Sequence, residues 1–186
     1  MIDKIITESI KNHTAALESI DFDSIEQIII EILNGISNGS TIFWLGNGGS
    51  ASQANHLSAE LLGGMYKKKI NPFKSICLNN DTAFITAWSN DDSFDNVFER
   101  QLQALAKEND IAIFLSTSGN SKNLLKAADF ANNNGIRIIS FTGNDGGELK
   151  TKSHLNININ SEVTQHIQEM HIFLGHIICE IIEKSN

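Results

Sequence analysis

Thr41-Ile-Phe-Trp-Leu-Gly-Asn-Gly-Gly-Ser50 is the stretch from which the fold can be worked out. Its apolar first half predicts a short buried strand, and its glycines and serine predict a loop. A helical pattern over residues 51–66 follows at once. Backbone N–H groups and the helix dipole at such a junction can hold an anion. His56 and Glu60, four residues apart, share one face of this helix. One segment therefore offers both an anion site and a candidate reaction centre.

Short apolar runs followed by helical periodicity continue along the chain. Further strands are expected at residues 73–78, 111–115, 136–142 and 155–159, between helices at 81–89, 93–106, 121–134 and 162–184. Strands that alternate with helices indicate βαβ units. We therefore predict an α/β fold, a three-layer sandwich with a five-stranded parallel sheet flanked by helices. Residues 2–37 predict an N-terminal helical extension in two segments, broken near residues 21–24.

Composition narrows the range of functions. The chain has 186 residues, which indicates a single domain over residues 1–186. Its net charge is −8, and its basic residues are scattered apart from Lys67-Lys68-Lys69, which we interpret as a solvated helix end. This argues against a nucleic-acid surface, which needs a basic stripe. No apolar run approaches the ~20 residues that span a bilayer, and no signal peptide is recognisable. We therefore expect no membrane partner and a cytoplasmic location.

Three residues of the predicted strands and helices are expected in the core. Cys77 and Cys179 lie far apart in apolar surroundings, so we interpret them as small core residues and not as a disulfide or a metal pair. Phe173 stands at helical spacing from Cys179 and is expected in the core as well.

Two loops at strand ends share the same chemistry. The first is Gly46–Ser50, and the second is Ser116-Thr-Ser-Gly-Asn-Ser121. In open α/β sheets ligands bind beyond the carboxyl ends of the strands, so the pair could enclose a phosphate without any lysine. A serine-rich turn alone often only caps its helix. The candidate phosphate ligands are Asn47, Gly48, Gly49, Ser50, Ser116, Thr117, Ser118 and Ser121.

Two nucleotide-binding motifs fit the first loop poorly. No Gly-Lys-Ser/Thr follows the glycines, so the loop is not a P-loop. Gly46, Gly48 and Ala51 satisfy the relaxed dinucleotide pattern Gly-x-Gly-x-x-Ala. The acidic residue that this pattern requires about 20 positions later is missing, and Asp81 comes too late.

The motifs in this order resemble those of the sugar isomerase (SIS) domain family. The resemblance depends on two loops in this order: Gly46-Asn-Gly-Gly-Ser-Ala51 and then Ser116–Ser121. His56-x-x-x-Glu60, Trp88-Ser-Asn-Asp91, Ile167-Gln-Glu-Met-His171 and His176 are similar to motifs of its phosphoheptose isomerases. The resemblance implies conversion of sedoheptulose 7-phosphate to D-glycero-D-manno-heptose 7-phosphate through an enediol. This is the first step of ADP-heptose synthesis, which leads to lipopolysaccharide.

The resemblance also implies roles for individual residues. Glu60 would be the base and His176 the acid of the aldose–ketose isomerisation. Glu60, Asn90, Asp91 and Gln168 would contact the substrate. One zinc ion per subunit would be bound by His56, Glu60, Gln168 and His176. One departure stands out: Gln165 occupies a position that is acidic in some members, so a sugar contact from that position is in doubt.

The assembly expected from the resemblance is a homotetramer, in which residues 1–38 take part in packing and oligomerisation. Helix geometry gives a separate reason. Gln168 and His176 on one straight helix are about 12 Å apart along the axis and roughly 80° apart around it. Two side chains so far apart would have to stretch to meet at one ion. We therefore predict that each active site is built by more than one subunit.

Other functions are also compatible with this sequence. The same fold serves a non-catalytic regulator that associates with DnaA, sugar-phosphate sensors in transcriptional regulators, and other sugar-phosphate isomerases. Retention of Glu60, Gln168 and His176 favours an enzyme. Asp91 could equally cap a helix that begins near Ser93. The remaining histidines are interpreted as surface or packing residues: His13, His154, His166 and His171.

Overall fold

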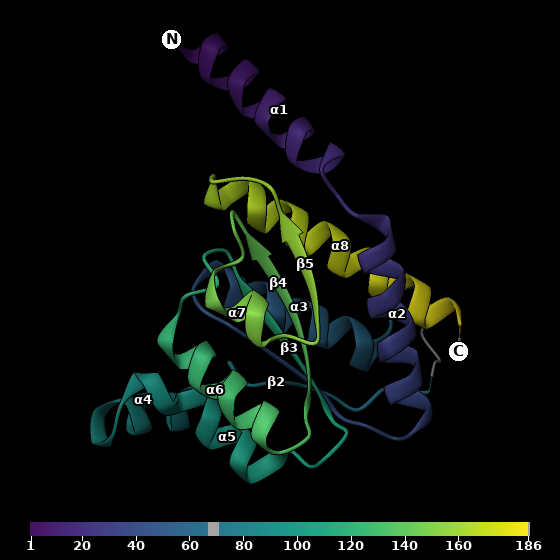
Figure 1. Ribbon diagram of the computed structural model, residues 1–186, viewed down its shortest axis with the longest axis vertical. Coiled ribbons are helices and arrows are strands. Elements are labelled where there is room, and N and C mark those ends of the chain that lie inside the picture. Colours follow the sequence, from purple (N-terminus) through teal and green to yellow (C-terminus); the bar gives the residue numbers. More distant parts are fainter. Residues whose placement is uncertain (67–70, 186) are drawn as a thin grey trace.

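The computed structural model describes residues 1–66 and 71–185 (Figure 1). Its centre is one parallel sheet with the strand order β2-β1-β3-β4-β5. The strands are β1 (Ile42–Gly46), β2 (Ser75–Cys77), β3 (Ile111–Ser116), β4 (Arg137–Gly143) and β5 (Leu155–Ile159). The predicted five-stranded parallel sheet is confirmed. β2 is shorter than predicted because it is an edge strand whose ladder with β1 covers Ser75 to Cys77.

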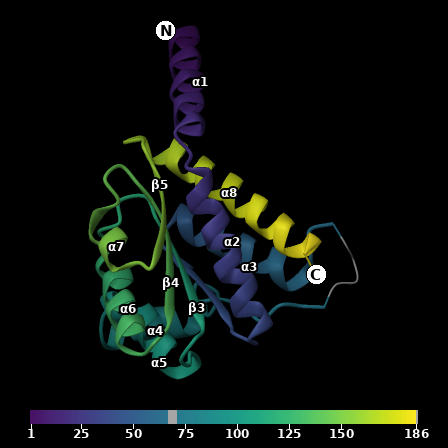
Figure 2. The same ribbon diagram turned by 45° about the vertical axis from the view of Figure 1, so that its right-hand side comes forward.

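Helices cover both faces of the sheet (Figure 2). One face carries α2 (Phe22–Ser37), α3 (Gly49–Gly63) and α8 (Thr164–Lys184). The other carries α4 (Thr82–Asp91), η1 (Phe94–Asn96), α5 (Val97–Leu105), α6 (Lys122–Asn133) and α7 (Gly147–Lys152). Successive strand residues point to opposite faces. Ile42 and Trp44 of β1 accordingly join the core under α3 and α8, whereas Phe43 and Leu45 join the core under α5 and α6. The predicted three-layer sandwich is confirmed.

The N-terminal extension consists of α1 (Ile2–Glu18) and α2, as predicted. The break falls where Asp21 caps α2, because its carboxylate accepts hydrogen bonds from the Asp23 N–H and the Ser24 hydroxyl. α1 projects from the body of the molecule (Figure 1). Ala16 is its one buried residue, so α1 gains little from packing within a single chain. The role of residues 1–38 in oligomerisation stays a prediction.

Several elements differ from the prediction. α3 begins at Gly49 and ends at Gly63, before residue 66, and Lys67-Lys68-Lys69 lies outside the described residues. The helix expected at 93–106 is divided into η1 and α5. α7 was not predicted, because the six residues between Gly146 and Ser153 carry too short a periodic pattern.

Core predictions were right for both cysteines and wrong for Phe173. Cys77 and Cys179 are buried free thiols. Phe173 is 43% exposed and lines an apolar groove between α2 and α8. Its neighbour Leu174 takes the inward position on α8 instead. In the part of the chain that the structure describes, no helix has the length and hydrophobicity required to traverse a bilayer.

Candidate active site

The two loops predicted to hold an anion, Gly46–Ser50 and Ser116–Ser121, are called the anion loops. They lie side by side because their strands are neighbours. β1 pairs with β3, and Gly46 is opposite Leu115 at the carboxyl ends of both strands. The Asn47 and Asn123 side chains exchange two amide hydrogen bonds of 2.9 Å. Asn123 is buried in the first turn of α6, so this pair ties the first loop to the helix that follows the second. The two loops therefore lie together at the carboxyl edge of the sheet, and their binding of a phosphate stays a prediction.

Glycine is required at two positions of the first loop. A Cβ on Gly46 would lie 2.9 Å from the Leu115 carbonyl oxygen, which leaves no room for a side chain. Gly48 has a φ of +55°, a backbone conformation that L-residues with a side chain rarely adopt. α3 starts directly after it, and Ser50 is buried in the first turn. The glycines therefore leave the backbone N–H groups at the start of α3 uncovered by bulky side chains.

The second loop is shaped by its own serines. Ser116 Oγ accepts a hydrogen bond from the Gly119 N–H, and Ser118 Oγ accepts one from the Asn120 N–H. These bonds use the hydroxyl oxygens as acceptors, so each hydroxyl hydrogen can still be donated to a ligand. Ser121 is the N-cap of α6, and within the described residues its side chain makes no capping bond. Both roles considered for this loop, turn formation and ligand binding, are compatible with this geometry.

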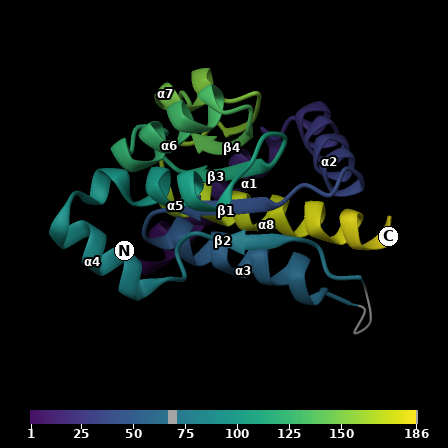
Figure 3. The ribbon, with the colours of Figure 1, turned by 90° about the horizontal axis from the view of Figure 1, so that it is seen from below.

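A single stripe of α3 faces α8. Four residues follow one another at four-, three- and four-residue steps, which places them on one side of the helix: Gly49, Gln53, His56 and Glu60. α3 and α8 lie next to each other (Figure 3). A Cβ on Gly175 of α8 would lie 2.4 Å from Leu57 Cδ1 of α3. The absence of a side chain at Gly175 thus lets the two helices approach closely beside His56.

This approach brings together the predicted reaction centre. His56 Nε2 lies 2.8 Å from His176 Nε2, and the two rings meet edge to face with centroids 5.0 Å apart. His56 Nε2 also lies 3.4 Å from Glu60 Oε1. A nitrogen–nitrogen hydrogen bond needs one N–H and one lone pair, so one of these imidazoles presents an unprotonated Nε2. A proton can therefore be held at this pair and transferred from it.

The three side chains are also suited to a metal. His56, Glu60 and His176 each offer one ligand atom, and these atoms lie within 4.8 Å of one another. Imidazole and carboxylate are the usual zinc ligands. The geometry of these three residues in one chain fits the zinc site implied by the resemblance.

Gln168 takes a different place from the other three proposed ligands. Its carboxamide lies against Gly49, where an added Cβ would be 2.6 Å from Gln168 Nε2. Gly49 and His56 are about 10 Å apart along α3. The predicted separation of Gln168 and His176 along α8 is thus present, and Gln168 lies toward the anion loops. A site shared between subunits stays a prediction.

Gln53 was missed at the sequence level. Its Nε2 donates a 2.6 Å hydrogen bond to the Gln168 carbonyl oxygen, which joins α3 to α8 between the anion loops and the histidine pair. Its Oε1 is buried and has no partner among the described residues. The spacing of Gln53 from Gly49 and His56 was the available signal, but its partner is 115 residues away.

Asn90 and Asp91 end α4, which has no buried residue and packs on η1 and α5. Asn90 Nδ2 donates to Asp91 Oδ1 at 2.8 Å, and both residues are exposed. Ser93, and not Asp91, caps the following turn, since Ser93 Oγ accepts a hydrogen bond from the Asp95 N–H. Asn90 and Asp91 therefore take no part in the contacts between α3 and α8 that the structure describes.

Two of the remaining histidines have structural roles. His171 is fully buried, and its Nε2–H donates to the Thr142 carbonyl oxygen at 3.0 Å. Burial lowers the pKa of His171 to about 4. His154 Nδ1 accepts a hydrogen bond from the Ile138 N–H. Burial beside Arg137 lowers the pKa of His154 as well. Both are packing or surface residues, as predicted.

Comparison with known proteins shows close similarity over nearly the whole chain. Residues 7–143 match the SIS domain family. A phosphoheptose isomerase of Helicobacter pylori (strain Shi470) is 41% identical over 188 aligned positions, which cover 99% of this chain and 97% of that protein. One from Aquifex aeolicus is 42% identical, covering 82% of this chain and 80% of that protein. The structure of a phosphoheptose isomerase from Francisella tularensis superposes with a TM-score of 0.92 at 30% identity and covers 98% of both chains.

Proposed function

The chain belongs to the SIS domain family, and within it to the phosphoheptose isomerases, and we propose that Glu60 and His176 perform its aldose–ketose isomerisation. The observation that carries this proposal is the contact of His56 with both residues, 2.8 Å to His176 and 3.4 Å to Glu60. An acid and a base must act on adjacent carbons, so they must lie close together.

The proposed substrate is sedoheptulose 7-phosphate and the product D-glycero-D-manno-heptose 7-phosphate. The Glu60 carboxylate removes a proton from C1 while His176 donates a proton to the oxygen on C2, which gives the enediol. Glu60 then returns its proton to C2, and His176 takes the proton of the hydroxyl on C1, which gives the aldehyde. No proton is gained or lost overall. His56 holds the Nε2 of His176 in the orientation that this exchange requires.

The phosphate is proposed to bind at the start of α3 and α6. The ligands would be the backbone of Asn47, Gly48 and Gly49 and the hydroxyls of Ser50, Ser116, Thr117, Ser118 and Ser121. Ser50 and His56 are about 9 Å apart along α3. A substrate whose phosphate is on C7 and whose reacting carbons are C1 and C2 suits this separation.

Gln168 is proposed as a substrate ligand between these two ends. Its carboxamide faces the first turn of α3, and Gln53 holds its backbone carbonyl. Asn90 and Asp91 are proposed as further ligands, which would reach the substrate only in the assembled oligomer, because α4 packs away from α8 in the single chain.

We also propose that zinc binds here, one ion per subunit. His56, Glu60 and His176 would hold it, with Gln168 as a fourth ligand if its side chain turns away from Gly49. When bound, zinc polarises the oxygens of the substrate. The support is the convergence of two imidazole nitrogens and one carboxylate within 4.8 Å.

A homotetramer with active sites at the subunit interfaces is the proposed assembly. Its support is the apolar surface that the single chain leaves uncovered. Phe22 is 80% exposed, and a groove of about 710 Å³ between α2 and α8 is lined by Ile25, Ile29 and Phe173. Patches of this kind mark protein interfaces. Light scattering after gel filtration would test the assembly, and a monomer would rule it out.

The enzyme is proposed to work in the cytoplasm, at the first step of ADP-heptose synthesis for lipopolysaccharide. Two buried free thiols are compatible with a reducing compartment.

The decisive experiment is an isomerisation assay with sedoheptulose 7-phosphate on the wild type and on Glu60→Gln, with and without a chelator. Turnover should fall about 10²–10⁴-fold in Glu60→Gln, because loss of a general base costs that much. Circular dichroism and the unfolding midpoint should stay unchanged. Absence of wild-type turnover even with added zinc would leave a non-catalytic sugar-phosphate-binding role.

A further inference from the structure

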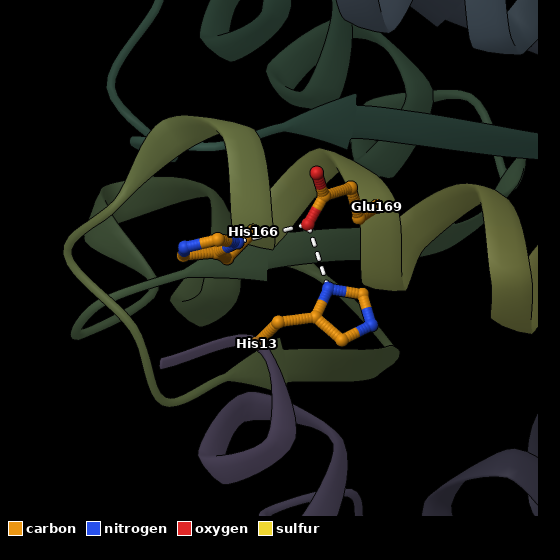
Figure 4. Close-up of side chains that lie close together, drawn as sticks. All are labelled: His13, His166 and Glu169. Carbon is orange, nitrogen blue, oxygen red and sulfur yellow. Dashed lines mark hydrogen bonds and ion pairs between the residues drawn. The ribbon is translucent and has the colours of Figure 1, made fainter. Parts of the chain in front are cut away.

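A second cluster of side chains of the types that ligate metals joins α1 to α8 (Figure 4). His13 Nδ1 and His166 Nδ1 lie 2.7 Å and 2.8 Å from the same atom, Glu169 Oε2. The two imidazole rings meet edge to face with centroids 5.9 Å apart. The three ligand atoms lie within 4.8 Å of one another, as in the proposed active site. His13 and His166 were interpreted from the sequence as surface or packing residues, and the structure brings them together.

The cluster is distinct from the proposed active site. Glu169 follows Gln168 directly, so the two side chains leave α8 about 100° apart. Gln168 points toward Gly49 of α3, whereas Glu169 meets His13 of α1. The same cluster lines a small hollow of about 210 Å³ together with Ser9 and Ile10 of α1.

The positions and the exposure of the three side chains suit metal binding. The Nδ1 atoms of His13 and His166 both point at the Glu169 carboxylate, and each neutral imidazole offers Nδ1 to a metal when its proton is on Nε2. His166 is only 5% exposed, which fixes its ring. The His13 and Glu169 side chains are 42% and 49% exposed, which leaves a path for an ion to enter.

We propose that His13, His166 and Glu169 form a second zinc site, which fastens α1 to α8. Two imidazole nitrogens and one glutamate oxygen are a donor set that zinc proteins use repeatedly. Nitrogen donors select zinc and related transition metals over magnesium or calcium. Among the described residues no fourth histidine, cysteine or carboxylate joins the group, so water from the hollow completes the coordination.

The two nitrogen–oxygen distances need only a small adjustment to accept the ion. Zinc bonds of about 2.0–2.1 Å place neighbouring ligand atoms roughly 3.3 Å apart in a tetrahedron. The nitrogen–oxygen distances of 2.7 and 2.8 Å would therefore open by about half an ångström. The partly exposed His13 can move by this amount without disturbing the core.

Zinc binding at this site would fix the position of α1. This helix buries Ala16 alone, so few contacts within the chain hold it. A zinc ion shared by His13 and two residues of α8 would hold α1 in the orientation seen in Figure 1. Binding would protect the amides of α1, because a ligand that binds only the docked helix shifts the equilibrium toward it.

The test uses the full chain with His56→Ala and His176→Ala, which removes the other candidate zinc site. Calorimetric titration of the chelator-treated protein with zinc chloride should give one site per chain. His13→Ala and Glu169→Gln, each added to this background, should weaken that binding more than about 100-fold, since even outer-shell partners of a metal are worth about 10–100-fold. Glu180→Gln, on the same helix but paired with Lys184, is the matched control and should leave binding unchanged.

A second measurement separates a metal site from a hydrogen-bonded clamp. Zinc should slow hydrogen exchange over residues 2–18 in the His56→Ala, His176→Ala background and should not do so once Glu169→Gln is added. Glu169→Gln preserves side-chain shape, so this comparison remains valid if His13→Ala perturbs α1. Failure to bind zinc in that background, or equal binding with Glu169→Gln, would overturn the proposal. Either result is independent of isomerase activity.

Discussion

His56 and His176 are 120 residues apart in the sequence, and their Nε2 atoms lie 2.8 Å apart. α3 and α8 run in the same direction with matching spacing, since Gln168 meets Gly49 and Gly175 meets Leu57. The candidate site is thus a seam between two helices, with the anion loops at one end and the histidine pair at the other.

The histidine pair should behave as one unit in catalysis. We expect His176→Asn to lower kcat about 10²–10⁴-fold through loss of the general acid. His56→Asn should lower kcat less, because it acts by orienting His176. The double variant should be little worse than His176→Asn, since residues that act together give non-additive losses. Steady-state kinetics on all three variants would check this, and losses that multiply would show independent roles.

Gly49→Ala should damage activity without damaging stability. Its Cβ would lie 2.6 Å from Gln168 Nε2, so the flexible carboxamide must move away from the anion loops. We expect kcat/KM to fall more than about 10-fold, while the free energy of unfolding changes by less than about 1 kcal/mol. Gly63→Ala is the control, because it lies on the same helix and its Cβ would meet nothing within 4 Å. Equal activity of the two variants would remove Gln168 from the substrate site.

Gly175→Ala should have the opposite profile, with a clear loss of stability. Its Cβ would lie 2.4 Å from Leu57 Cδ1, and Leu57 is fully buried. Overpacking of this kind costs about 1–3 kcal/mol. Urea unfolding would measure the loss. Combining it with Leu57→Ala should cost less than the sum of the single changes, because the smaller side chain relieves the contact. Additive costs would mean that Gly175 does not set the spacing of α3 and α8.

Buried His171 should make the protein sensitive to acid. Burial lowers its pKa from 6.5 to about 4, so the folded state prefers the neutral imidazole. The unfolded chain takes up the proton first as the pH falls. This contribution to stability is therefore full above pH 6.5 and is lost between pH 6.5 and about 4, on the order of 3 kcal/mol in total.

His171→Phe removes the titrating group and keeps a ring beside Phe141, which His171 now meets edge to face. Over the same pH interval we expect the unfolding free energy of this variant to depend less steeply on pH than that of the wild type. Chemical denaturation at several pH values would give both slopes. Parallel slopes would assign the acid sensitivity to other groups.

Much of the site follows from local sequence patterns. The β1 apolar run, the glycines after it and the amphipathic start of α3 each act within a few residues, and the side of α3 shared by His56 and Glu60 follows from helix geometry alone. The position of both anion loops at the carboxyl edge of the sheet also follows from a general rule for parallel sheets. These features could be predicted because each depends on neighbours in the chain or on a general rule of topology.

Other features required the packed structure. The sequence could not show that Phe173 is exposed and that Leu174 points inward, because α8 offers apolar residues on more than one side. Nor could it show that Gln53 binds the Gln168 carbonyl, or that His13 meets His166 and Glu169 across more than 150 residues.

The sequence by itself determined the sheet, the two anion loops and the helix face that carries the candidate chemistry. Tertiary structure alone decided which residues of α8 and α1 meet that chemistry and where a second ligand cluster forms. The physical reason is that helix periodicity specifies the faces of a helix, whereas the partner of each face depends on how closely two helices can pack. In this protein a single missing side chain, at Gly175, permits the packing that brings His176 to His56.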